Sequence, residues 1–123
     1  MSDTRIDPAL SQWLETLEPG DENYLYCLQC AAAITRETAR QEIDGQHRHR
    51  FINPAAVVYE VCCYTSAPGV DISGEATHEH SWFPAYTWQY VHCSDCASHL
   101  GWYFECRGKH AFFALIDGRI TGL

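Results

Sequence analysis

Two CxxC units constrain the fold of this chain more than any other feature of its sequence. They are Cys27-x-x-Cys30 and Cys93-x-x-Cys96, and the 62 residues from 31 to 92 separate them. A CxxC turn directs two thiolates at one point, and two such turns together form the tetrahedral four-sulfur site that Zn²⁺ prefers. The sequence therefore predicts one zinc ion that joins two sheets far apart in the chain. Because four thiolates leave no open coordination position, the predicted role of the zinc is structural.

The cysteine count supports metal binding over a disulfide framework. The chain has seven cysteines, an odd number that is high for a reducing compartment, where disulfides are rare. An iron–sulfur cluster or a redox dithiol is the alternative for the paired units. We interpret the other three, Cys62, Cys63 and Cys106, as small buried or unreactive side chains, with a reactive thiol among them as the open alternative.

Charge and hydropathy exclude two classes of partner. Eight Lys and Arg residues stand against 16 Asp and Glu residues, which gives a net charge of −8. Binding to nucleic acid or to an anionic membrane requires basic residues that neutralise phosphates, so neither partner is expected. No apolar run approaches ~18 residues, and the N-terminus lacks the charged and apolar regions of a signal peptide. We therefore expect a soluble cytoplasmic protein of one domain.

The first 23 residues differ in texture from the rest of the chain. Asp7 is a suitable N-cap, and Pro8 suits the first helical position. Apolar residues then follow at helical spacing until Pro19-Gly20 ends the pattern. We predict a short amphipathic helix or a tail over residues 1–23, followed by one domain over residues 24–123.

From residue 24 onward the sequence is typical of short strands. The run "VVYEVCCY" (57–64) places alternate residues on one face, "YTWQYVH" (86–92) does the same with aromatic side chains, and "AFFALI" (111–116) indicates a buried strand. Turn signals such as Asp44-Gly45 and Pro68-Gly69 separate these runs. The segment 34–43 has a helical composition but lies between a metal-binding turn and a strand, so its structure stays open. The pattern predicts a mainly β domain.

Three tryptophans lie close together in the sequence around the second CxxC unit. They are Trp82, Trp88 and Trp102, with a bend at Phe83-Pro84 and a glycine just before the third. Such a group of indoles can enclose either a cation or a small flat ring. A tryptophan-rich core between two sheets is the alternative. The histidines show no comparable pattern: we predict no second metal site, and we interpret His99 as a surface or locally hydrogen-bonded group.

These residues also carry a family resemblance. The chain resembles the CULT domain, the ligand-binding domain of cereblon, in its single-domain bacterial form. The matching stretches are "CLQC" (27–30), "FINPAA" (51–56), "THEHSWFPAYTWQYVHCSDCASHLGWYF" (77–104) and "FFALI" (112–116). They cover roughly residues 24 to 117 in the family's order.

The resemblance implies a β-tent, in which two antiparallel sheets meet at an angle and a four-cysteine zinc site holds them at the apex. It also implies that the three tryptophans form a cage with Phe104 at its base. The guest of this cage would be a cyclic imide, such as the glutarimide ring of thalidomide-type drugs, or a uracil-like ring such as that of uridine. The guest would be free or carried at the end of a protein.

The chemistry of an imide agrees with this expectation. Its edge presents an acceptor, a donor and an acceptor. The Trp82 N–H can donate to one ring carbonyl, the His80 carbonyl can accept the ring N–H, and the His80 side chain can reach the second ring carbonyl. Leaving such an edge unpaired in a buried site costs about 1–3 kcal/mol. Asn53 and Pro54 match the family's "NP" loop and would contact the ring's substituent. The predicted ligand-binding residues are Asn53, Pro54, Glu79, His80, Ser81, Trp82, Trp88, Trp102 and Phe104.

The sequence departs from the family's pattern at two points, and two alternative functions stay open. Ala85 stands where the family commonly has glycine, and no protease-like or adaptor-binding domain is expected, so the role of ubiquitin-ligase substrate receptor is not carried over. We predict a binding module without catalytic activity. Because methionine sulfoxide reductase B shares the β-tent, Cys106 or Cys63 could instead be a nucleophile. Glu79 near the cage could favour a methyl-ammonium guest.

Overall fold

The computed structural model describes residues 23–122, so the helix or tail predicted near the N-terminus lies outside the described residues. The described part is almost entirely β-structure. Its elements are β1 (Tyr24–Cys27), β2 (Ala33–Arg36), the short 3₁₀ helix η2 (Glu37–Ala39), β3 (Arg48–Ile52), β4 (Val58–Tyr64), β5 (Val70–Thr77), β6 (Thr87–Cys93), β7 (His99–Glu105), β8 (Phe112–Ile116) and β9 (Ile120–Gly122). Over residues 23–122, no helix combines the length and apolar character that a membrane crossing requires.

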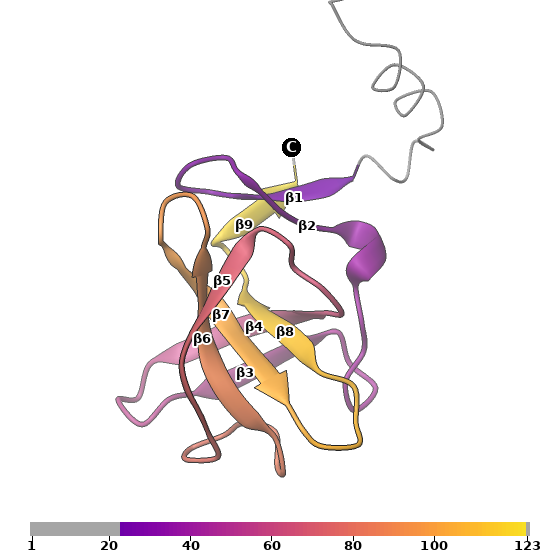
Figure 1. Cartoon of the computed structure of the whole chain (residues 1–123), viewed down its shortest axis with the longest axis vertical. Coiled ribbons are helices and arrows are strands. Elements are labelled where there is room, and N and C mark those ends of the chain that lie inside the picture. The colour runs from indigo at the N-terminus through magenta and orange to yellow at the C-terminus, as the bar shows by residue number, and fades with distance from the viewer. Residues whose placement is uncertain (1–22, 123) are drawn as a thin grey trace, which may run out of the picture.

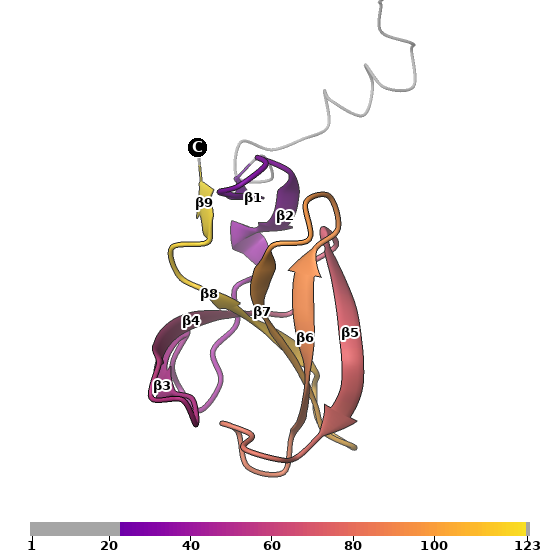
Figure 2. The same cartoon turned by 90° about the vertical axis from the view of Figure 1, so that its left-hand side faces the viewer.

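The strands form two antiparallel sheets, as predicted. The smaller sheet has the order β2-β1-β9, and the larger has the order β3-β4-β8-β7-β6-β5. Figure 1 shows the smaller sheet lying across one end of the larger one. In Figure 2 the larger sheet is strongly bent, with β3 and β4 on one side, β5 to β7 on the other and β8 between them.

Both faces of the larger sheet are buried over part of their area, which explains the continuous apolar runs. On β4, Val61 and Cys63 belong to one core cluster, whereas Cys62 and Tyr64 belong to another. The cluster of Cys62 and Tyr64 also includes Leu25 of β1, and therefore lies where the two sheets meet. The other cluster lies on the opposite face and is rich in aromatic rings. This second face carries the cavity described below.

The two sheets are joined by close backbone contacts as well as by side chains. Gly69, just before β5, donates its N–H to the Ile34 carbonyl of β2 at 3.0 Å. A Cβ atom at Gly69 would collide with the Ala33 carbonyl oxygen, so only glycine allows this approach. The buried hydroxyl of Thr35 donates to the Ser66 carbonyl at 2.7 Å.

The segment 34–43, which the composition left open, combines several short structures. Its first residues belong to β2, three residues form η2, and Arg40 makes an isolated bridge with Tyr64. Strand pairing with β1 therefore prevails over helical composition at its start, because tertiary contacts outweigh the small differences in helix propensity.

Candidate metal centre and ligand cavity

The four paired cysteines meet at the junction of the two sheets. Cys27 ends β1 and Cys93 ends β6, while Cys30 and Cys96 lie in the turns that follow these strands. Their sulfur atoms all lie within 4.8 Å of one another. The Sγ atoms of Cys27 and Cys96 are 3.7 Å apart, and those of Cys30 and Cys93 are 3.5 Å apart. Four sulfurs at about 2.3 Å from a tetrahedral zinc ion would be about 3.8 Å apart, so the cluster fits a metal ion of this kind.

The two CxxC turns repeat the same backbone geometry. In the first, the Ala31 N–H donates to the Cys27 carbonyl at 2.8 Å, and in the second the Ala97 N–H donates to the Cys93 carbonyl at 2.9 Å. Both alanines have φ of 66°, in the left-handed region that favours glycine. We call these two turns the cysteine knuckles. Their likeness indicates that each is formed by local hydrogen bonds.

The thiol acidities show why this cluster suits a cation. A hydrogen bond from the Ser98 side chain lowers the pKa of Cys96 to about 6. For Cys30, a hydrogen bond to the Ala32 backbone lowers the pKa, but desolvation and the neighbouring thiols raise it to about 12. The Cys30 thiol therefore resists ionisation beside its neighbouring thiols. A divalent metal ion would favour four thiolates, because a coordinating thiol is deprotonated.

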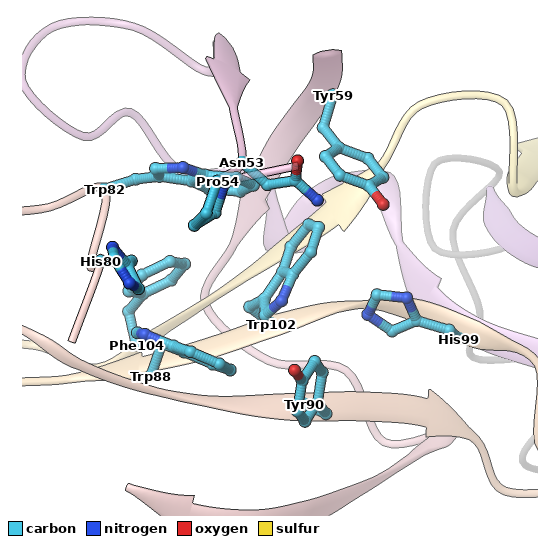
Figure 3. Close-up of a pocket in the computed structure, with 10 residues that line it drawn as sticks. All are labelled: Asn53, Pro54, Tyr59, His80, Trp82, Trp88, Tyr90, His99, Trp102 and Phe104. Carbon is cyan, nitrogen blue, oxygen red and sulfur yellow. The ribbon is translucent and has the colours of Figure 1, made fainter. Parts of the chain in front are cut away.

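A cavity of about 490 Å³ lies on the aromatic face of the larger sheet. Its lining residues are Asn53, Pro54, Tyr59, His80, Trp82, Trp88, Tyr90, His99, Trp102 and Phe104. Figure 3 shows the three indoles on three sides of this space. Trp82 and Trp102 meet nearly at right angles, with ring centroids 4.7 Å apart and an interplanar angle of 72°. Trp88 instead packs against Tyr90, with centroids 5.0 Å apart.

The three walls have different supports. Trp102 lies on β7 and is buried, whereas Trp82 lies in the loop between β5 and β6. The ring of Phe51 on β3 stacks on Trp82, with ring centroids 4.8 Å apart and an interplanar angle of 9°. The Trp82 Nε1–H donates to the Ile52 carbonyl at 3.3 Å. The Trp88 Nε1–H donates to the Glu79 carbonyl at 2.7 Å. The Trp82 wall therefore depends on the position of β3.

The loop residue His80 has a left-handed backbone conformation, which is uncommon for residues other than glycine. Its φ is 60°, and the turn is closed by a hydrogen bond of 3.0 Å from the Ser81 N–H to the His78 carbonyl. Such a conformation costs energy and is concentrated at functional sites. Over residues 23–122, no protein group hydrogen-bonds to the His80 carbonyl or the Trp82 N–H. Both backbone groups therefore remain available beside the cavity.

The base of the cavity is firmly packed. Phe104 is only 1% exposed and stacks on Phe112 of β8 with centroids 5.3 Å apart. Phe83, also buried, meets the ring of Phe104 edge-on at 4.8 Å. Asn53 at the rim accepts the N–H groups of Ala55 and Val57 through Oδ1, which fixes its loop. Its amide NH₂ is the part of this side chain left to contact a ligand.

Seven of the nine residues predicted to bind the ligand line this cavity, and two do not. Glu79 contributes its backbone carbonyl to the Trp88 indole, and its side chain is exposed. The hydroxyl of Ser81 donates to the Phe83 carbonyl at 3.0 Å and accepts the Phe83 N–H at 3.4 Å. Both residues hold the loop that presents His80 and Trp82.

Three lining residues were not in the predicted set: Tyr59, Tyr90 and His99. Tyr90 alternates with Trp88 on β6, so the period of two placed it on the right face. His99 is three residues from Trp102 and would fall on the opposite face of a regular strand. The pairing of β6 with β7 shifts between Val91 and His92, so that a bulge at Leu100 brings His99 to the face of Trp102.

Gly101 allows this bulge to pack closely against β8. A Cβ atom there would collide with the Ala114 carbonyl oxygen and lie 2.9 Å from the Leu115 Cα. The ring of His99 consequently meets Trp102 edge-on, with centroids 5.0 Å apart. His99 is also locally hydrogen-bonded, since its Nε2 lies 3.0 Å from the Gly101 carbonyl oxygen.

The other cysteines lie outside both the metal centre and the cavity. Desolvation by burial raises the pKa of Cys63 to about 12 and also raises that of Cys62, which disfavours their thiolates. Cys106 is half-buried in the loop after β7, in a different part of the surface from the cavity. No thiol of the described residues thus lines the cavity.

The sequence of this chain is similar to those of cereblon proteins from several animals. Protein cereblon of chicken (Gallus gallus) is 36% identical over 89 residues, which cover 69% of this chain and 20% of the chicken protein. Protein cereblon of zebrafish (Danio rerio) is 33% identical over 89 residues, with the same two coverages of 69% and 20%. Protein cereblon of Drosophila willistoni is 30% identical over 92 residues, which cover 69% of this chain and 14% of the fly protein.

The matched region is thus a limited part of these relatives. The chain spans about a fifth or less of the length of each. No protein-family model matches the chain.

Proposed function

This chain is a cereblon-like domain of the CULT type, and on that premise we propose that it is a non-catalytic module that binds a small ring. The proposed guests are cyclic imides, such as glutarimide and thalidomide-type compounds, or uracil-like rings such as that of uridine. The resemblance to a single-domain bacterial form stays a prediction. So does the expectation that the guest is free or attached to a protein terminus.

One observation carries the proposal: three indoles surround a cavity beside two backbone groups that have no hydrogen-bond partner among residues 23–122. The indole faces suit a flat ring. The His80 carbonyl can accept the ring N–H, and the Trp82 N–H can donate to a ring carbonyl. The His80 side chain, which also lines the cavity, can donate to the second carbonyl. An imide edge has the matching order of acceptor, donor and acceptor.

The alternative guests and reactions have less support in this geometry. No carboxylate is among the described lining residues, and Glu79 does not face the cavity, so little favours a methyl-ammonium guest. A sulfoxide reductase would need a reactive thiol beside the bound substrate. Cys63 is buried with a raised pKa, and Cys106 lies away from the cavity.

We further propose that the metal of the four-cysteine cluster is zinc. The four sulfur donors and their spacing support this choice over harder cations, which prefer oxygen ligands. When bound, the ion would supply a cross-link between β1 and β6. Elemental analysis of the purified protein should find one zinc per chain. Iron in place of zinc would contradict the proposal.

The ligand proposal is tested by titrating the full chain with glutarimide and with N-methylglutarimide. Calorimetry and tryptophan fluorescence measure the binding. We expect glutarimide to bind with a dissociation constant no tighter than about 1 μM, or about −8 kcal/mol, because so small a ligand makes few contacts. The N-methyl compound should not bind, since it has no donor for the His80 carbonyl. Equal binding of the two compounds would contradict the proposal. Stronger binding of tetramethylammonium would favour the methyl-ammonium alternative.

Two variants on neighbouring strands test the cage itself. Trp88→Ala should abolish glutarimide binding, because it removes one wall of the cage. The side chain of Trp88 is only half-buried, so the variant should keep its core. Tyr103→Ala removes a half-buried ring from the opposite face of β7 and is the matched control. Retained binding in Trp88→Ala would contradict the cage. Methionine sulfoxide reduction that disappears in Cys106→Ser would instead support the enzyme.

A further inference from the structure

The cavity extends past the tryptophan cage into a part with a polar lining. We call this part the tyrosine–histidine lobe; it is formed by Tyr59 of β4, Tyr90 of β6 and His99 of β7. Tyr59 and His99 each meet Trp102 edge-on, with centroid distances of 5.1 and 5.0 Å. The ring centroids of Tyr90 and His99 are 5.6 Å apart. Figure 3 shows His99 and the Tyr59 hydroxyl on the side of Trp102 away from His80.

The hydrogen-bonding state of His99 follows from its contact with Gly101. The Gly101 carbonyl oxygen, 3.0 Å from Nε2, can only accept, so Nε2 carries the hydrogen. In the neutral ring Nδ1 is then an acceptor. Desolvation lowers the pKa of His99, and the nearby charges of Arg119 and His92 lower it further, although the Gly101 carbonyl raises it. The neutral ring with an accepting Nδ1 is therefore favoured near pH 7.

The two phenol groups add hydroxyls to this acceptor. Over residues 23–122, neither the Tyr59 nor the Tyr90 hydroxyl has a hydrogen bond to another protein group. None of the ten lining residues is Asp, Glu, Lys or Arg. The chain as a whole carries a net charge of −8. The lobe thus offers neutral donors and acceptors, and the surrounding charge repels anions.

The cavity is also larger than a bare imide requires. Its volume of about 490 Å³ falls within the range of roughly 300–1,000 Å³ that is usual for drug-sized ligands. In both glutarimide and uracil rings, the usual substituted atom lies one carbonyl carbon away from the imide nitrogen. A substituent there leaves the ring in a direction away from the edge that faces His80 and Trp82. It would therefore point toward the rest of the cavity.

Resting on the proposed function, we propose that the tyrosine–histidine lobe binds an uncharged, hydroxyl-bearing substituent on the captured ring. Hydroxyl hydrogens of the substituent donate to His99 Nδ1, and its oxygens accept from the Tyr59 and Tyr90 hydroxyls. The same lobe rejects a phosphorylated substituent, because none of the described residues that line it is cationic. The site thereby distinguishes a neutral glycoside of the ring from both the bare ring and its phosphate ester.

The affinity test uses the full chain and three uracil compounds that share the same imide edge. They are uridine, 1-(tetrahydrofuran-2-yl)uracil, which lacks the hydroxyls, and uridine 5′-monophosphate. We expect uridine to bind about 10-fold more tightly than the hydroxyl-free compound, since one net hydrogen bond corresponds to a factor of about 3–10. The monophosphate should bind about 10-fold more weakly than uridine at low salt, with the difference shrinking as salt rises. Equal affinities for uridine and either compound would overturn the proposal.

Variants then locate the selectivity. Tyr59→Phe and Tyr90→Phe each remove a hydroxyl and keep the ring, so each should lower the affinity ratio of uridine to the hydroxyl-free compound about threefold. Tyr103→Phe, on the other face of β7, should leave this ratio unchanged. An unchanged ratio in both cavity variants would overturn the assignment of the lobe. This inference alone fails if the hydroxyl-free compound binds, its N3-methyl derivative does not bind, and the hydroxyls of uridine add no affinity. The proposed function fails as well if neither glutarimide nor any of the uracil compounds binds.

Discussion

The cysteine knuckles and the ligand cavity share strand β6 but are built in different ways. Cys93 ends this strand at the metal centre, and Trp88 near its start forms a wall of the cavity. Each knuckle is closed by hydrogen bonds between residues a few positions apart. The cavity instead takes its lining from β4, β6, β7 and two loops. The knuckles are therefore local structures that the metal would join, whereas the cavity exists only when distant segments pack together.

The supports of the two regions differ accordingly. At the knuckles, four sulfurs converge on one point, so a single bound ion would hold both segments. At the cavity, Trp82 is held by Phe51 and Ile52 of the edge strand β3, and His80 has a strained φ of 60°. At the knuckles, therefore, a bound metal ion would join the two sheets, whereas at the cavity the position of the Trp82 wall depends on packing against one edge strand.

The largest expected effect breaks the metal centre. Cys93→Ser removes one of four sulfur donors, and structural zinc contributes about 10–16 kcal/mol of binding free energy to folding in small domains. We expect this variant to lose both zinc and the cooperative unfolding transition measured by circular dichroism. Cys106→Ser, outside the cluster, is the control and should unfold as the natural protein does. A folded, zinc-free Cys93→Ser protein that still binds glutarimide would contradict the structural role.

The second effect tests the bulge that connects the two regions. Gly101→Ala places a methyl group against the Ala114 carbonyl oxygen, so the pairing of β7 with β8 must shift. We expect the free energy of unfolding to fall by about 3 kcal/mol. Gly122→Ala is the matched control, because its Cβ would meet Leu25 at an ordinary distance of 3.6 Å. Equal stability of the two variants would show that the bulge can relax at no cost.

The third effect concerns the wall formed by Trp82. Phe51→Ala removes the ring that stacks on it, and such aromatic pairs contribute about 0.5–1.5 kcal/mol, so glutarimide affinity should fall up to about 10-fold. Phe113→Ala removes a comparable half-buried ring from the opposite face of the sheet and should leave affinity unchanged. Calorimetric titration of both variants checks the difference. Unchanged affinity in Phe51→Ala would show that the loop alone positions Trp82.

The smallest effect sharpens the description of the knuckles. Ala97 has φ of 66°, where a side chain is unfavourable by about 1–2 kcal/mol, part of which glycine's flexibility offsets. We expect Ala97→Gly to raise the free energy of unfolding by about 0.5–1 kcal/mol. Ala33→Gly in strand β2 is the control and should lower it, because glycine weakens a strand. A destabilised Ala97→Gly protein would mean that the knuckle is not strained.

Much of the fold could be predicted because its determinants are local patterns. The two CxxC units identified the cysteines that meet, and alternation along β4 and β6 assigned their faces. The position of Ala85, where glycine is common in the family, has φ of 73°, which explains that preference. The segment 34–43 resisted prediction because pairing with β1 decides its start.

The residues of the candidate site could likewise be predicted only in part from the sequence. The three indoles, Phe104 and His80 line one cavity, as the family resemblance implied for the cage and its edge. Glu79 and Ser81 were included because they flank His80, but a loop can turn neighbouring side chains in different directions. Tyr59 lies on the same face as Val61 and could have been found by that alternation.

The sequence by itself determined the four cysteines that converge, the mainly β composition and the identity of the three indoles. Each of these depends on residue type and on spacing within a few positions, which local hydrogen bonding and the two-residue period of strands translate directly into structure. The tertiary structure alone decided that His99 faces the cavity and that Trp82 packs against Phe51 of β3. Those placements depend on a register shift and on packing between segments remote in the chain, where one extra residue reverses the face of a strand.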